Sequence, residues 1–96
     1  MSTLLKKNVC IFIQDENEEK YELMYTAFQH GNIYSLLVTM TDSYGLNDSV
    51  FLHDITRDES IVCEIVEILS NNTVTPCTVI NILEDLFSEL SFHHTH

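Results

Sequence analysis

The stretch Ser49–Leu69, SVFLHDITRDESIVCEIVEIL, contains the point at which the hydrophobic period of the chain changes. Its first part, Ser49–Ile55, reads as a short β-strand bounded by turn residues. After Thr56, apolar residues recur three and four positions apart, as they do along one face of an α-helix. The sequence therefore predicts a strand-rich first half and a helical second half.

Two helices are expected after this point. Thr56-Arg57-Asp58-Glu59 has the pattern of a capping box, with the Thr56 side chain accepting from the Glu59 amide. The first helix should then run to about Ser70. Thr75 and Pro76 are typical of the N-terminus of a second helix, with Thr75 as the capping residue and Pro76 in the first helical position. The residues predicted to form the two apolar faces are Ile61, Val62, Ile65, Ile68 and Leu69, then Val79, Leu83, Leu86, Phe87 and Leu90.

Three further strands are predicted before Ser49. They are Val9–Ile13, Tyr21–Phe28 and Ile33–Thr41, and the last alternates most clearly, with Tyr34, Leu36, Val38 and Met40 on one face. Polar segments at 14–20, 29–32 and 42–48 separate the strands, and Gly31 or Asn32 can take a positive φ. Loops this short between successive strands predict an antiparallel meander.

The expected fold class is therefore α+β, in the order ββββαα. A four-stranded antiparallel sheet is followed by a two-helix hairpin that packs on one face of the sheet. A chain of 96 residues makes one domain, for which we expect residues 1–92, with 93–96 as a flexible tail containing histidines.

The second face of the predicted sheet is also apolar. One helical hairpin covers only one face, so the other should be covered in part by the chain termini, or by a second copy of the chain or a partner. The residues expected there as a partner or dimer contact are Phe12, Phe28, Leu37 and Phe51.

The balance of charge limits the possible partners. Fifteen acidic and four basic residues give a formal net charge of −11. No segment gathers enough Lys or Arg to neutralise several phosphates, so direct nucleic-acid binding and binding to anionic membranes are disfavoured. An acidic surface attracts basic partners, although it can also serve solubility alone. The acidic residues expected as a contact on the helices are Glu64, Glu67, Glu84, Asp85 and Glu89.

The cysteines and the N-terminal segment indicate a cytoplasmic protein. Cys10, Cys63 and Cys77 are odd in number and form no CxxC pair, which is typical of reduced thiols. The first residues do not have the order of charges, apolar core and cleavage site found in a signal peptide. The longest apolar runs are also much shorter than the roughly 20 residues of a membrane-spanning helix.

Residues that could carry chemistry are few, and we expect no catalytic site, no cofactor and no metal. Cys77 lies at a predicted helix N-terminus, where a thiol pKa is lowered, but no base is predicted beside it. Two glycines in the whole chain exclude a phosphate-binding loop or a dinucleotide fingerprint. His93, His94 and His96 could chelate a metal, as a native end or as the remnant of a tag, without the surrounding groups that make a specific site.

The helical half resembles a family of small uncharacterised proteins from clostridial Firmicutes. The resemblance rests on Asp54-Ile55-Thr56 before a capped helix, then Pro76, then the run Asn81–Leu86, and covers roughly residues 20–90. It implies a bacterial cytosolic protein and implies no activity.

These observations predict a small acidic regulatory or adaptor protein that acts by protein–protein binding. A homodimer is also predicted. One alternative is an inhibitor whose carboxylates imitate the phosphates of nucleic acid, as in phage-type and anti-restriction proteins. Another is a structural protein without a regulated partner.

Overall fold

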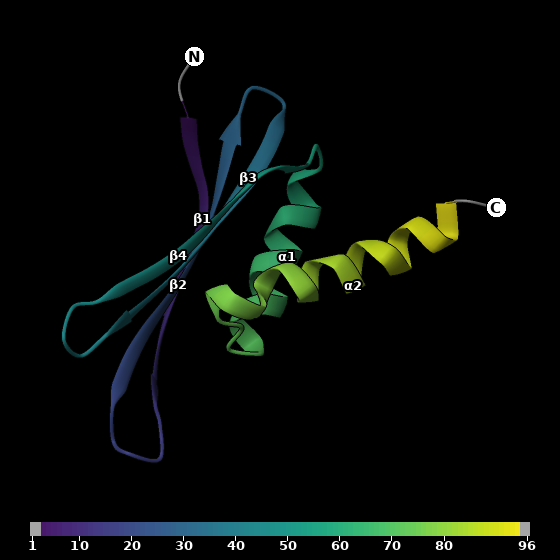
Figure 1. Cartoon of the computed structure of the whole chain (residues 1–96). Coiled ribbons are helices and arrows are strands. Elements are labelled where there is room, and N and C mark those ends of the chain that lie inside the picture. Colours follow the sequence, from purple (N-terminus) through teal and green to yellow (C-terminus); the bar gives the residue numbers. More distant parts are fainter. Residues whose placement is uncertain (1–2, 95–96) are drawn as a thin grey trace.

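In the computed structural model the sheet comes first and the helices follow, and the α+β prediction is confirmed. The structure describes the backbone of residues 3–94 and the side chains of residues 3–86. The strands are antiparallel neighbours in the order β1-β2-β3-β4, and both helices lie on one side of the sheet (Figure 1). The elements are β1 (Thr3–Gln14), β2 (Lys20–His30), β3 (Ile33–Asp42), β4 (Asn47–Thr56), α1 (Glu59–Asn71) and α2 (Pro76–His94).

The core lies between the helices and the sheet. α1 packs against all four strands, and α2 packs against β3 and β4. Tyr34, Leu36 and Val38 are buried as predicted, and Met40 at the end of that row is half-buried. The other core residues are Leu23, Tyr25 and Ala27 from β2, Val62, Ile65, Val66 and Leu69 from α1, Val74 from the connection, and Val79 and Leu83 from α2.

β1 begins six residues earlier than predicted, at Thr3 instead of Val9. The pairing with β2 shifts between Leu5 and Lys7, where Lys6 is the extra residue of a β-bulge. A bulge breaks the alternation of faces, so Lys6 and Lys7 both reach α1. Lys6 Nζ lies 3.2 Å from Glu59 Oε1, and Lys7 Nζ lies 2.8 Å from Glu67 Oε1. The polar run at 6–8 is therefore part of the strand, held against the helix by two ion pairs.

The N-terminus of α1 differs from the predicted capping box. The N-cap is Asp58, because its backbone is extended (φ −108°, ψ 116°) and its carboxylate accepts from the Ser60 amide at 2.9 Å. The Ser60 hydroxyl also donates to this carboxylate at 2.6 Å, and these hydrogen bonds hold the pKa of Asp58 below its ordinary value. Thr56 instead ends β4 opposite Tyr34 and accepts from the Asp58 amide at 3.1 Å.

The turns β1–β2 and β3–β4 use the same arrangement of hydrogen bonds. Asp15 Oδ1 accepts from the amides of Asn17 and Glu19, at 2.9 and 3.0 Å. Asp42 Oδ1 accepts from the amides of the residues two and four positions later, both at 2.9 Å. Each turn has a left-handed residue three positions after the aspartate, Glu18 (φ 64°) or Gly45 (φ 85°). Two carboxylates of the acidic surface therefore hold turns in place.

The β2–β3 turn is a two-residue hairpin loop. His30 pairs with Ile33, so Gly31 and Asn32 form the turn. Gly31 takes the positive φ of 66°, which settles the choice left open by the sequence. A glycine in the first of the two positions is typical of a type II′ turn, whose twist matches that of the flanking strands.

The connection between the helices is a Schellman motif. The Val74 amide donates to the Leu69 carbonyl at 3.0 Å, and the Thr73 amide donates to the Ser70 carbonyl at 3.3 Å. Thr73 occupies the left-handed position at φ 47°, where glycine is usual and a β-branched residue is strained. Val74 and Leu69 are both buried, so the motif directs the chain back toward the sheet.

α2 begins at Pro76, as predicted, and its first turns face the sheet through Val79 and Leu83. Its C-terminal end points away from the sheet (Figure 1). The predicted core residues Phe87 and Leu90 lie outside the described side chains. The predicted tail at 93–96 also falls largely outside the described residues, although α2 includes His93 and His94.

Tyr25 joins the sheet to the connection between the helices. Its ring is fully buried in the middle of β2, and its hydroxyl donates to the Val74 carbonyl at 2.6 Å. This bond satisfies a buried carbonyl that the turn leaves without a helical partner. Burial also raises the pKa of Tyr25 to about 12, because the core disfavours the charged phenolate.

We expect Tyr25→Phe to lower the free energy of unfolding by about 1–2 kcal/mol at neutral pH, because the Val74 carbonyl stays buried without a donor. In the wild type, stability should also fall as the pH rises from about 10 to about 12. In that window the phenol is ionised in the unfolded chain and protonated in the folded one. Urea titrations of both proteins at neutral and alkaline pH measure these effects. Equal pH dependence of the two proteins would contradict the assignment.

We expect Thr73→Gly to raise the free energy of unfolding by about 1 kcal/mol, because glycine adopts the left-handed conformation without the clash of a branched side chain. Thr73→Ala keeps a Cβ atom and is the control, with a smaller gain. Thermal unfolding followed by circular dichroism compares the three proteins. A less stable glycine variant would show that the Thr73 side chain stabilises the turn.

Candidate protein-binding face

The sheet has one face that no described element covers. We call it the uncovered face, and its central side chains carry no charged group. They are Leu5, Asn8 and Cys10 of β1, Met24, Thr26 and Phe28 of β2, Ser35, Leu37 and Thr39 of β3, and Ser49, Phe51 and His53 of β4, with Phe12 toward one end. The helices lie on the opposite side (Figure 1).

The four apolar residues predicted for this contact do share this face. Phe12 is 75% exposed and Phe51 is 44% exposed, whereas Phe28 and Leu37 are half-buried. Leu37 lies directly opposite Phe51 in the β3–β4 pair. The Phe28 and Phe51 rings are 6.3 Å apart between centroids, so they form one aromatic surface across three strands. Phe12 lies apart from it on β1, opposite Glu22.

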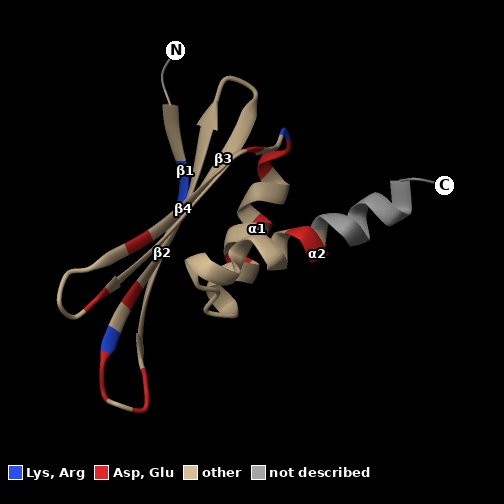
Figure 2. Cartoon of the chain, in the orientation of Figure 1, with Lys and Arg blue, Asp and Glu red and all other residues tan. Residues whose placement is uncertain are grey.

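Charged residues of this face lie toward its two ends, with Lys20 and Glu22 of β2 at one end and Asp54 of β4 at the other. The described acidic residues lie mostly at the adjacent turn and on the helices (Figure 2). An apolar centre with charged residues at its margin is the usual composition of a protein interface.

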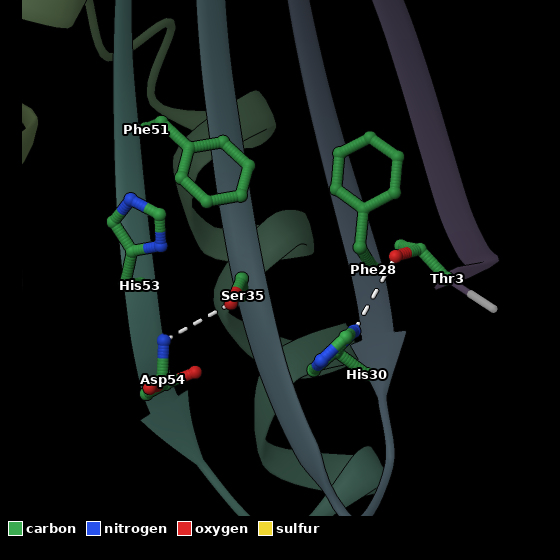
Figure 3. Close-up of a pocket in the computed structure, with 7 residues that line it drawn as sticks. All are labelled: Thr3, Phe28, His30, Ser35, Phe51, His53 and Asp54. Carbon is green, nitrogen blue, oxygen red and sulfur yellow. Dashed lines mark hydrogen bonds between the residues drawn. The ribbon is translucent and has the colours of Figure 1, made fainter. Parts of the chain in front are cut away.

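Shallow pockets lie at the two ends of the face. One, of about 300 Å³, is lined by Phe12, Glu22 and Asp42 among others. The other, of about 250 Å³, is formed by residues of all four strands near the β2–β3 turn. Figure 3 shows it with Thr3, Phe28, His30, Ser35, Phe51, His53 and Asp54 around it.

The acidic residues predicted as a contact lie on the helical layer and not on the uncovered face. Glu64, Glu84 and Asp85 are exposed there, and the side chain of Glu89 lies outside the described part. Glu67 is engaged by Lys7, whose hydrogen bond and positive charge hold the pKa of the Glu67 carboxyl below its ordinary value. The described members of the apolar and acidic sets, which the sequence predicts as separate contacts, therefore lie on opposite sides of the molecule.

Groups suited to chemistry are dispersed over the described residues. No three of their His, Cys, Asp or Glu side chains are arranged to hold a metal ion. Cys77, the thiol at the start of α2, is exposed and lies 3.2 Å from the Thr75 hydroxyl. In the part of the chain that the structure describes, neither helix has the length and apolarity needed to span a membrane.

Cys10 is the cysteine on the uncovered face. Partial desolvation raises the pKa of its thiol, and the charge and hydrogen bonding of the nearby Glu22 carboxylate raise it further. The two residues are diagonal neighbours, since Cys10 pairs with Met24 and Phe12 pairs with Glu22. A raised pKa keeps the thiol protonated and less nucleophilic.

The comparisons with known proteins place the chain in a family. The model of a family of unknown function, DUF6514, matches residues 1–89. The chain belongs to this family. The DUF6514 match spans the sheet, α1 and most of α2, so the fold described above is that of the matched region. No curated protein and no solved structure matches the chain. The resemblance to a family of uncharacterised proteins is confirmed, and its clostridial origin stays a prediction.

We expect Glu22→Gln to increase the rate at which iodoacetamide alkylates Cys10 at neutral pH by about two- to fivefold, because the thiolate no longer faces a carboxylate. Mass spectrometry of peptides follows each cysteine separately. Glu64→Gln removes the same charge from the helical layer and should leave the Cys10 rate unchanged. An equal effect of the two variants would show that only the net charge matters.

Proposed function

We propose that this protein is a small regulatory or adaptor-type binding protein of the cytoplasm, whose uncovered face engages a basic protein partner. The observation that carries the proposal is the exposure of aromatic residues on a sheet face opposite the helical layer. Phe12 and Phe51 expose 75% and 44% of their surface there. Large contiguous apolar patches are rare on monomers and mark interaction surfaces.

The composition of the face suits a protein more than other ligands. Aromatic residues contribute much of the energy of protein interfaces when a partner excludes water from around them. The nearby Thr26 hydroxyl donates to the Asn8 side chain at 3.1 Å, so these two polar groups of the face already have partners within the fold. Covering the face therefore leaves these groups hydrogen-bonded.

The charge balance favours a basic partner. The chain has four Lys and Arg residues against fifteen acids, and Lys6 and Lys7 are already paired with Glu59 and Glu67 of α1. A protein carrying opposite charge would be attracted over distances of about 8–10 Å at physiological salt. Two copies of this chain, with a charge of −11 each, would repel one another over the same range.

A second copy is the other candidate for the face, and the homodimer predicted from the sequence stays a prediction. Light scattering of the purified protein separates the two cases. A mass near 11.1 kDa leaves the face open to a different protein, and twice that mass supports the homodimer.

We expect affinity purification from the natural host with the wild-type chain to recover a basic protein, and Phe12→Thr or Phe51→Thr to reduce its recovery about tenfold. Each substitution removes an exposed aromatic ring and keeps a residue suited to a strand. Recovery is measured by quantitative mass spectrometry at low and high salt.

The matched control is Ile80→Thr on α2, because Ile80 is 48% exposed, much as Phe51 is, and lies in the helical layer. It should leave the recovery unchanged. Circular dichroism checks that each variant is folded. Equal recovery with the Phe12, Phe51 and Ile80 variants would overturn the proposal.

A further inference from the structure

The pocket near the β2–β3 turn combines aromatic rings with a carboxylate and, unlike the pocket at the other end of the uncovered face, has no Lys or Arg in its lining. Phe28 and Phe51 form its upper part, and Asp54 lies at its lower edge (Figure 3). The His53 and Phe51 rings pack in an edge-to-face arrangement, with centroids 4.3 Å apart. The orientation of Phe51 is therefore supported from two sides, by His53 and by Phe28.

An irregularity of β4 brings Asp54 to this place. Tyr34 pairs with Thr56 and Leu36 pairs with Leu52, so Ser35 alone lies opposite the three residues 53–55. Asp54 takes a left-handed backbone conformation, φ 53°, and its amide donates to Ser35 Oγ at 3.0 Å. Ser35 is buried, so this hydrogen bond anchors the bulge. Bulges of this kind redirect side chains and often lie at functional sites.

The Asp54 carboxylate forms no hydrogen bond or ion pair with another side chain in the described part of the protein. None of the seven residues around the pocket is a Lys or Arg. Apart from His30 and His53, no side chain around the pocket can supply a positive charge to this exposed carboxylate. The strongly acidic chain favours the approach of a positively charged group from another molecule.

We propose that this pocket receives an arginine side chain of the protein partner, with its guanidinium against the Phe51 ring and hydrogen-bonded to the Asp54 carboxylate. A guanidinium is planar, stacks on aromatic rings and donates two parallel hydrogen bonds to a carboxylate. The inference rests on the proposed function and names the residue type by which the basic partner is recognised.

The size and chemistry of the pocket favour this occupant over others. Its volume of about 250 Å³ is below the usual range of sites for drug-sized ligands and cofactors, and suits a single side chain. A lysine ammonium pairs with a carboxylate as a point charge, without the planar stacking surface. His30, His53 and Asp54 are not arranged to hold a metal ion.

The test uses N-acetylargininamide, a single arginine side chain without peptide charges, titrated into the ¹⁵N-labelled protein at neutral pH and about 150 mM salt. Addition of N-acetylargininamide should change the backbone amide chemical shifts of the pocket residues Phe28, Ser35, Phe51 and Asp54. N-acetyllysinamide should bind more weakly, and the uncharged N-acetylcitrullinamide should cause no shifts at these residues. Shifts spread over the acidic turns, or equal binding of the citrulline compound, would overturn the proposal.

Asp54→Asn removes the carboxylate charge and keeps a residue that tolerates the left-handed conformation. It should weaken binding of N-acetylargininamide about five- to tenfold. The matched control is Asp48→Asn, which removes an equal charge from an exposed position of the same strand, on its other face, and should bind as the wild type does. An equal loss of N-acetylargininamide binding in the two variants would show that only the net charge of the protein matters, and would refute the proposed pocket.

The two proposals fail separately. Were Phe12→Thr to abolish recovery of a partner that Asp54→Asn recovers fully, the uncovered face would be the interface and the arginine pocket would be refuted. If Asp54→Asn no longer bound N-acetylargininamide while no variant of the uncovered face changed the recovery of any protein, the pocket would bind guanidinium and the proposed function would be refuted.

Discussion

The hydrogen bond from Tyr25 to the Val74 carbonyl connects the two layers at their centre. Tyr25 lies on an inner strand, and Val74 lies in the connection where the chain reverses between α1 and α2. The position of both helices on the sheet therefore depends on a turn that must bring one carbonyl to one phenol. Thr73 makes this turn by taking a strained left-handed conformation, and Val74 is buried beside the sheet. A two-layer protein of this size has a small core, so a single buried hydrogen bond is a substantial part of its stability.

Much of the fold could be predicted because the hydrophobic pattern changes once along the chain, from period two in the strands to period 3.6 in the helices. The rows Tyr34–Met40 and Ile61–Leu69 give the sheet face and the helix face that pack together. What the pattern misses is local backbone geometry. The polar residues 6–8 interrupt the alternating pattern of β1 at the bulge, which places Lys6 and Lys7 where they pair with two glutamates of α1 only in the folded chain. The N-cap at Asp58 was missed because Thr56 also fits a capping pattern.

Of the candidate site, the shared sheet face could be predicted from the sequence and the local geometry of the pocket could not. Phe12, Phe28, Leu37 and Phe51 share a face because alternation along strands fixes it. The helical carboxylates were predicted as a separate contact, and the described ones lie on the helical layer, on the other side of the molecule. The pocket around Asp54 was missed. Three residues of β4 opposite one of β3 cannot be read from a strand pattern, and the available signal was an aspartate that interrupts Ser49–Ile55. The sequence also does not show that Asp15 and Asp42, which contribute to the net charge, accept hydrogen bonds from backbone amides in the turns.

The order of the layers along the chain has a consequence for biosynthesis. All four strands precede both helices, and sequential hairpins with short turns can form as the chain leaves the ribosome. The inner row of Leu23, Leu36 and Val38 then has no cover until the segment through Leu83 is made. Leu83 follows the end of β4 by 27 residues, which take roughly 1–5 s of translation. A sheet that formed in this interval would expose both of its apolar faces, and only the later helices remove one of them from water.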